Sequence, residues 1–189
     1  MIKINKTPNF NAIDEIRNLE TKYSLSDTQK ILLSTDGSIT NILDVLKGTV
    51  NIKTFKQEHR KANKDIAELL AIDEGDEVNY RVVIIRIKEE PLIYATSYTP
   101  LKRLTEEFKE DLTRADIPIG RILKIHKIES RREVRSIEIK ETNEELKKIF
   151  KTDADLLSRT YNIIHKDNIL ISIEETFPIS SFTYDLKTS

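Results

Sequence analysis

Apolar residues in the first fifty positions recur at helical spacing. Ile13, Ile16 and Leu19 are three residues apart, which places them on one face of a helix. A second apolar stripe follows Ser38, a residue type that often caps helix N-termini, and stops before Gly48, a common residue at helix ends. The pattern predicts helices over residues 11–23, 26–33 and 38–48.

After residue 76 the pattern changes from helical spacing to alternation rich in β-branched residues, which is typical of strands. Turn-forming residues at 88–91 and 166–168 separate two pairs of such segments and predict two hairpins. The charged stretch 57–61 is interpreted as a connection. Strands are expected over residues 50–55, 78–87, 92–98, 128–140, 156–165 and 169–177, and helices over 64–70, 105–114 and 119–125, with a short helix capped by Asn143.

Together these elements predict an α+β fold in which helices flank a mostly antiparallel β-sheet. We see no internal repeat, low-complexity tract or change in composition that would divide the 189 residues. A chain of this length is long enough to bury a core and a ligand cavity in one unit. The sequence therefore predicts a single domain over residues 1–189 and leaves its oligomeric state open.

Several kinds of chemistry lack the residues they require. Without cysteine there is no thiol nucleophile, disulfide or Cys-bound zinc. The three histidines, His59, His126 and His165, are far apart and outside the HxxxH and HExxH patterns, so no metal site is predicted. A Gly-rich phosphate loop and a GxSxG motif are also missing, which gives nucleotide hydrolysis and hydrolase chemistry no support.

The charge pattern bears on partners and location. With a net charge of −1, the chain has no basic field suited to nucleic acid. The basic run at residues 131–135 also contains acid and is interpreted as a solvated strand face. Since no segment approaches the roughly 20 apolar residues of a membrane span, and the first residues lack a signal-peptide core, we expect a cytoplasmic protein with no membrane partner.

Arg81 is the first candidate for binding chemistry. Strand alternation places it on the same face as Val83, Ile85 and Ile87. A charged guanidinium on an apolar face needs a carboxylate, from the protein or from a ligand, or a path for its end to reach water. The residue pattern alone leaves a ligand contact, a structural ion pair and a solvent-reaching side chain open.

Two adjacent carboxylates near the C-terminus are the second candidate. Alternation places Glu175 with Ile171, Ile173 and Phe177, and Glu174 on the opposite face. Periodicity therefore favours Glu175 as the buried carboxylate, and a β-bulge could exchange the two faces.

Four short segments, spread over most of the chain, together resemble the chorismate pyruvate-lyase family. They are SIT at residues 38–40, YRVVI at 80–84, IPIG at 117–120 and IEETFP at 173–178. The resemblance implies an enzyme that eliminates pyruvate from chorismate and leaves 4-hydroxybenzoate, using neither metal nor organic cofactor. Its partner would be chorismate or another small aromatic carboxylate.

The family pattern also implies roles for individual residues. Arg81 would hold the ring carboxylate, helped by the main-chain amides of Ile39 and Ile119, and Gly120 would keep the approach open. The glutamate four residues before the proline is Glu174, which would face the hydroxyl end of the ring and act as general acid on the ether oxygen. On this register we assign the catalytic roles to Arg81 and Glu174, against the periodicity that favours Glu175.

The same fold also forms the effector-binding domain of GntR-type transcription regulators. The segments PLIYA at residues 91–95 and PIG at 118–120 resemble those domains equally well. The segment before Ser38 is shorter and less basic than a winged-helix DNA reader requires. A non-catalytic module that binds a small molecule therefore stays open as the alternative, and formation of pyruvate from chorismate distinguishes the two.

Overall fold

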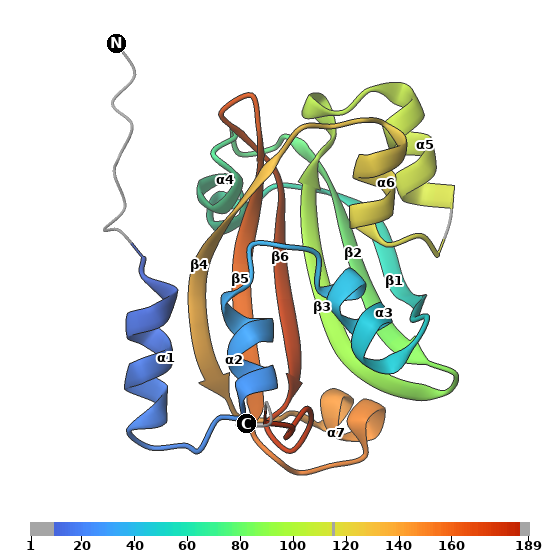
Figure 1. Ribbon diagram of the computed structural model, residues 1–189. Coiled ribbons are helices and arrows are strands. Elements are labelled where there is room, and N and C mark those ends of the chain that lie inside the picture. Colours follow the sequence, from blue (N-terminus) through green and yellow to red (C-terminus); the bar gives the residue numbers. More distant parts are fainter. Residues whose placement is uncertain (1–9, 115, 186–189) are drawn as a thin grey trace.

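The computed structural model describes residues 10–114 and 116–185. Over these residues the chain forms a six-stranded antiparallel sheet with the strand order β1-β2-β3-β6-β5-β4 (Figure 1). The predicted α+β class is therefore confirmed. The strands are β1 (Asn51–Lys61), β2 (Glu77–Ile87), β3 (Glu90–Pro100), β4 (Arg131–Lys140), β5 (Leu156–His165) and β6 (Asn168–Pro178).

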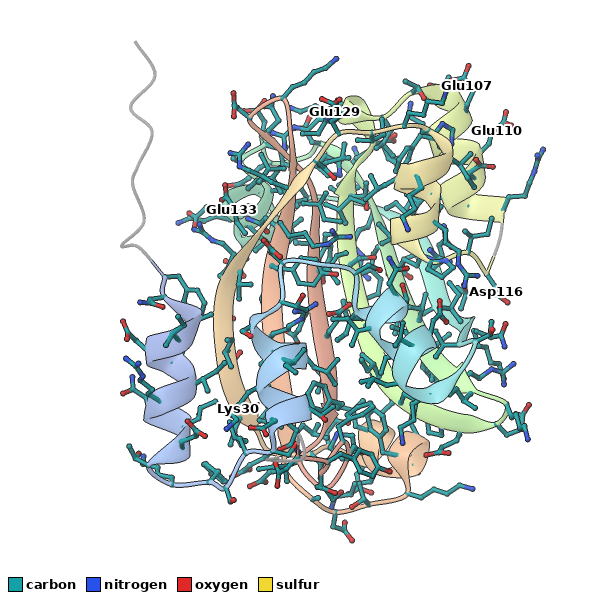
Figure 2. All side chains as sticks on the ribbon, in the orientation of Figure 1. Lys30, Glu107, Glu110, Asp116, Glu129 and Glu133 are labelled. Atoms are coloured by element: carbon teal, nitrogen blue, oxygen red, sulfur yellow. The ribbon has the colours of Figure 1, made fainter. Side chains whose placement is uncertain are left out.

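Helices α2, α3 and α6 lie in front of the sheet in Figure 1, whereas α4 lies behind it. Their apolar faces pack onto the strands, and their charged faces point outward, as Glu107 and Glu110 of α5 do in Figure 2. No helix in the described ranges is long and apolar enough to span a bilayer. The helices are α1 (Ala12–Glu20), α2 (Asp27–Ser34), α3 (Ile39–Lys47), α4 (Lys64–Leu70), α5 (Glu106–Arg114), α6 (Ile119–Ile125) and α7 (Glu144–Phe150), with a 3₁₀ turn η1 (Leu101–Arg103).

The largest difference between a predicted and an observed boundary lies at the end of the first strand. The charged stretch 57–61 belongs to β1, which pairs with β2 without interruption from Lys56 to Lys61. Because β1 is an edge strand, one of its sides has no neighbouring strand, and charged side chains can stay hydrated there. Charge therefore did not end this strand.

The fold contains a structural repeat that the sequence did not reveal. The order α2-α3-β1-α4-β2-β3 recurs as α5-α6-β4-α7-β5-β6. Local details recur as well. Asn63 and Asn143 cap α4 and α7 through their side chains, and Ala71 and Lys151 end these helices in the left-handed conformation. Both β1 and β4 carry a register shift near their middle.

The two repeats meet where β3 pairs with β6, over the register from Tyr94↔Thr176 to Tyr98↔Ser172. This pairing puts β2 and β5 at matching positions on either side of the seam, and α3 and α6 begin above the same face of the sheet. A cavity formed there takes walls from both repeats.

Candidate functional site

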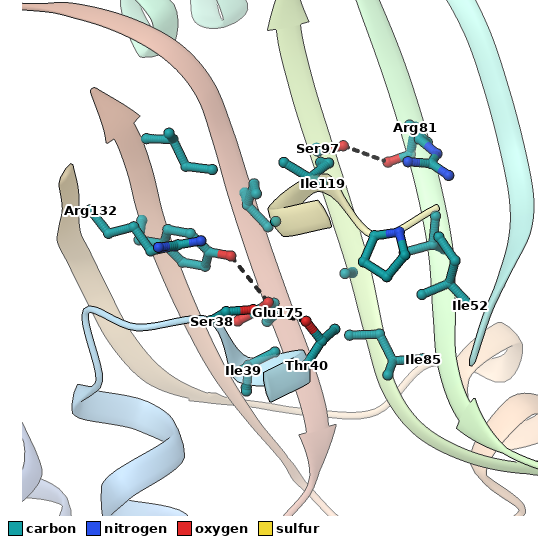
Figure 3. Close-up of a pocket in the computed structure, with 17 residues that line it drawn as sticks. Ser38, Ile39, Thr40, Ile52, Arg81, Ile85, Ser97, Ile119, Arg132 and Glu175 are labelled. Carbon is teal, nitrogen blue, oxygen red and sulfur yellow. Dashed lines mark hydrogen bonds between the residues drawn. The ribbon is translucent and has the colours of Figure 1, made fainter. Parts of the chain in front are cut away.

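A cavity lies between the sheet and the first residues of α3 and α6 (Figure 3). Its walls leave about 550 Å³ free of protein atoms, part of it open to solvent. Most of the lining is apolar, with contributions from β2, β3, β5 and β6, which is the usual character of a small-molecule site. Four of the five predicted site residues line it, namely Ile39, Arg81, Ile119 and Gly120.

Arg81 is a fully buried cation at one end of this cavity, with 1% of its surface exposed. Its Nη1 donates to the carbonyl of Ile117 at 3.1 Å, and its Nη2 donates to Oγ1 of Thr54 at 3.3 Å. Burial lowers the pKa of Arg81, and the charge of Asp116 opposes that shift. An arginine starts from so high a pKa that it keeps its charge. The predicted face of Arg81, shared with Val83 and Ile85, is confirmed.

Glu175 is the buried carboxylate of the cavity, 4% exposed. Its Oε2 accepts a hydrogen bond from Nε of Arg159 at 2.8 Å, and its Oε1 accepts one from the Tyr161 hydroxyl at 3.1 Å. Burial raises the pKa of Tyr161, and the charge of Glu175 raises it further, so the phenol stays protonated and donates. Arg159 also donates to the carbonyl of Thr35 at 2.8 Å, which ties this cluster to the segment before α3.

The structure corrects the assignment of the site carboxylate. Glu174 does not line the cavity; it lies on the opposite face of β6, about two-fifths exposed, and forms an ion pair with Lys140 at 2.9 Å. The pairing of β3 with β6 runs through Thr96↔Glu174 and Ala95↔Glu175 without a bulge, so simple alternation holds at this point. The register counted from Pro178 therefore points to a residue that does not line this cavity.

The helix residues assigned to substrate binding lie at different places around the cavity. Figure 3 shows Ile119 on the side of Arg81, whereas Ile39 lies farther from that guanidinium. Both residues open a helix, where the first N–H groups have no intrahelical acceptor. A Cβ placed on Gly120 would come within 3.2 Å of Oγ of Ser38, so glycine permits the two segments to approach closely.

The repeat relates the two buried arginines. Arg81 pairs with Ser97 across β2 and β3, and Arg159 pairs with Glu175 across β5 and β6. Each arginine also donates to a carbonyl just before the cavity helix of the other repeat, Arg81 to Ile117 and Arg159 to Thr35. The matching positions thus hold a serine beside Arg81 and a glutamate beside Arg159.

Sequence reasoning missed four polar residues here, Ser97, Arg132, Arg159 and Tyr161. Alternation within residues 156–165 places Arg159 and Tyr161 on one face with Ile163, which was the available signal. Arg132 lines the cavity, whereas the run that contains it was interpreted as a solvated face. The histidines lie elsewhere, and the described residues hold no group of three or more His, Asp or Glu side chains arranged for a metal.

This sheet, its helices and the cavity on the seam define a chorismate lyase-like protein. A model of the Rv2949c-like chorismate pyruvate-lyase family matches residues 33–184, and the chain belongs to that family. It is 42% identical over 172 residues to the protein named "Putative lyase MJ0807" of Methanocaldococcus jannaschii. The matched residues cover 87% of this chain and 85% of the relative.

Solved structures show the same fold at low sequence identity. The effector domain of PhnF from Mycobacterium smegmatis matches 81% of this chain and 96% of its own length, with a TM-score of 0.68 and 12% identity. A GntR-family regulator from Bacillus cereus matches 74% of this chain and 99% of its own, with a TM-score of 0.58 and 16% identity. These matches bear on the fold alone.

Proposed function

We propose that this protein removes pyruvate from chorismate and releases 4-hydroxybenzoate. The observation that carries the proposal is the presence of two separate, opposite charges in one cavity. The cation Arg81 lies at one end, the carboxylate of Glu175 lies away from it, and the walls between them are apolar. The product has a carboxylate and a hydroxyl at opposite ends of a flat ring. Membership in the chorismate pyruvate-lyase family agrees with this arrangement.

In this proposal Arg81 binds the ring carboxylate. A guanidinium presents parallel N–H groups that match both oxygens of a carboxylate, and burial strengthens that attraction. Ser97 is the residue beside Arg81, and the matching position in the other repeat holds Glu175. Because serine is shorter than glutamate, it leaves more room beside Arg81 for the ring carboxylate. Ile119 lies on the same side, and in this proposal its main-chain amide at the start of α6 adds a donor for the anion.

Glu175 replaces Glu174 as the site carboxylate, and it acts as a base in place of the general acid that the family pattern implies. Losing its charge would leave the buried Arg159 without a counter-ion, so Glu175 acts as a carboxylate that accepts hydrogen bonds. Arg159 and Tyr161 use only part of its accepting capacity. The carboxylate can therefore hold the hydroxyl end of the ring and receive the proton that leaves the hydroxyl-bearing ring carbon.

The reaction balances without an added reactant. The ether C–O bond breaks, the C–H bond at the neighbouring hydroxyl-bearing carbon gives its electrons to the ring, and the ring becomes aromatic. The departing enolate of pyruvate takes up one proton, so a base that accepts a proton and returns one completes the exchange. Aromatisation drives the reaction, and the protein supplies orientation and proton handling.

A module that binds a small aromatic acid without turnover is the second candidate, since PhnF and the Bacillus cereus regulator have this fold. The test is incubation of purified protein with chorismate, with pyruvate followed by lactate dehydrogenase and 4-hydroxybenzoate by chromatography. Equimolar products, formed faster than in a heat-inactivated control, are expected. Binding of 4-hydroxybenzoate with no pyruvate above that control would favour the binding module and overturn the lyase.

A further inference from the structure

A second arginine, Arg132 of β4, faces the same cavity. Figure 3 shows Arg132 and Arg81 on opposite sides of the cavity with Glu175 between them in the view. The Nε of Arg132 is buried without a hydrogen-bond partner in the described parts of the chain. Its Nη1 reaches the carbonyl of Asp36 at 3.4 Å, a long contact. The guanidinium thus keeps donor capacity next to the cavity.

Arg132 also differs from its neighbour in its ion pairs. Arg131 pairs with Glu133 at 3.0 Å and with Asp167 at 3.3 Å, outside the cavity. Over residues 10–114 and 116–185, no carboxylate lies within 4.0 Å of the charged nitrogens of Arg132. Its positive charge, which also acts on Tyr161, is therefore available to an anion in the cavity.

The repeat shows that the architecture does not require an arginine here. Ile52 pairs with Ile85 in the first repeat as Arg132 pairs with Ile163 in the second, and all four residues line the cavity. Ile52 fills its position as an ordinary core residue, 5% exposed. A partly buried cation at the equivalent position loses hydration that isoleucine would not lose. Binding of an anion offsets that loss.

The position of Arg132 also suits contact with the part of a substrate that is released after the reaction. Arg132, Ser38 and Gly120 line both the cavity and an adjoining open groove that contains Lys124 and Lys127. Arg132 therefore lies where the cavity meets solvent, whereas Arg81 is fully buried.

We propose that Arg132 binds the second carboxylate of the substrate, the one on the enolpyruvyl group. This inference rests on the proposed function. Chorismate carries two carboxylates, and its enolpyruvyl ether is attached next to the hydroxyl-bearing ring carbon. With the ring carboxylate on Arg81 and the hydroxyl on Glu175, the second carboxylate extends past Glu175 on the side of Arg132. After the ether bond breaks, this carboxylate belongs to pyruvate, which leaves through the open groove.

The test compares a ligand with two carboxylates and a ligand with one. Arg132→Met should raise KM for chorismate about 30-fold or more, the usual scale for removing one partner of a close charge pair. Affinity for 4-hydroxybenzoate, measured by calorimetry, should stay within about twofold because this ligand lacks the second carboxylate. Arg132→Lys should recover part of the chorismate KM, since it keeps the charge without the planar fork. Arg131→Met is the matched control and should change neither value.

Each outcome separates the two proposals. Turnover by the unsubstituted protein with an unchanged chorismate KM in Arg132→Met overturns the role of Arg132 and leaves the lyase intact. An equal loss of affinity for both ligands also overturns it, because Arg132 would then shape the cavity rather than bind the second carboxylate. If the unsubstituted protein neither binds nor converts chorismate, both proposals fail. A chorismate-specific loss confined to Arg132 supports the assignment.

Discussion

Exchanging each member of the Glu174–Glu175 pair for glutamine separates the two candidate carboxylates. Glu175→Gln keeps the size of the side chain but removes the charge that faces Arg159 and the cavity. Pyruvate formation should fall about 100-fold or more, the usual scale for losing a general acid or base. Glu174→Gln is the matched control, because it removes the same charge one residue away on the opposite face.

The two substitutions should also differ in stability. Arg159 is 0% exposed, so Glu175→Gln leaves a buried guanidinium without a counter-ion, a change that costs about 3–5 kcal/mol. In the ion pair of Glu174 with Lys140, the two side chains are 39% and 34% exposed. Losing such a pair costs about 0–1 kcal/mol. Urea denaturation of the three proteins measures the difference.

A double variant distinguishes lost chemistry from lost folding. Arg159→Met combined with Glu175→Gln removes both charges of this buried ion pair, so much of the lost stability should return while turnover stays low. Recovery of turnover together with stability would show that Glu175 has only a structural role. A large loss of turnover in Glu174→Gln alone would refute the placement argued from the cavity.

Three further outcomes are expected. Arg81→Met should weaken 4-hydroxybenzoate binding by about 2–5 kcal/mol in calorimetry, while Arg86→Met, on the same strand but paired with Glu89, should not; equal affinities would exclude Arg81 as the anchor. Turnover should continue in excess chelator with no cofactor added, and a divalent ion that restored chelated protein would contradict this. Hydrogen bonds from Thr54 hold the pKa of Asp116 below its usual 3.8. Any stability advantage of the unsubstituted protein over Asp116→Asn should therefore exist above pH 3.8 and vanish as the pH falls below that value. Thermal denaturation at several pH values measures it, and an advantage that grows at acid pH would contradict this prediction.

Much of the element order could be predicted from residue periodicity, because most helices and strands bury one face and expose the other. The same rule located the site charges. Alternation alone places Arg81 and Glu175 toward the cavity, since the pairing of β3 with β6 runs there without a bulge. The choice of Glu174 came from counting residues back to Pro178, whereas the structure places Glu174 on the face of β6 that points away from the cavity.

Other site residues depend on contacts between distant segments. Arg159 shares a strand face with Tyr161, but only the cross-strand pairing with Glu175 shows that it is a counter-ion. Arg132 lies on an edge strand whose register shifts between Val134 and Ser136, so its inward direction could not be predicted from alternation. The repeat was not visible in the sequence because equivalent positions hold unlike residues, apart from a few such as Asn63 and Asn143.

Those unlike residues give the cavity a direction. Two identical halves facing each other across the β3–β6 seam would offer the same groups to both ends of a ligand. Arg81 and Arg159 hold matching positions and keep this symmetry. Two other pairs of matching positions, Ser97 and Glu175, and Ile52 and Arg132, hold different residues and break it. Under the proposed function, a molecule with an acid at one end and a hydroxyl at the other has one bound orientation, and exchanging Ser97 with Glu175 should reverse it.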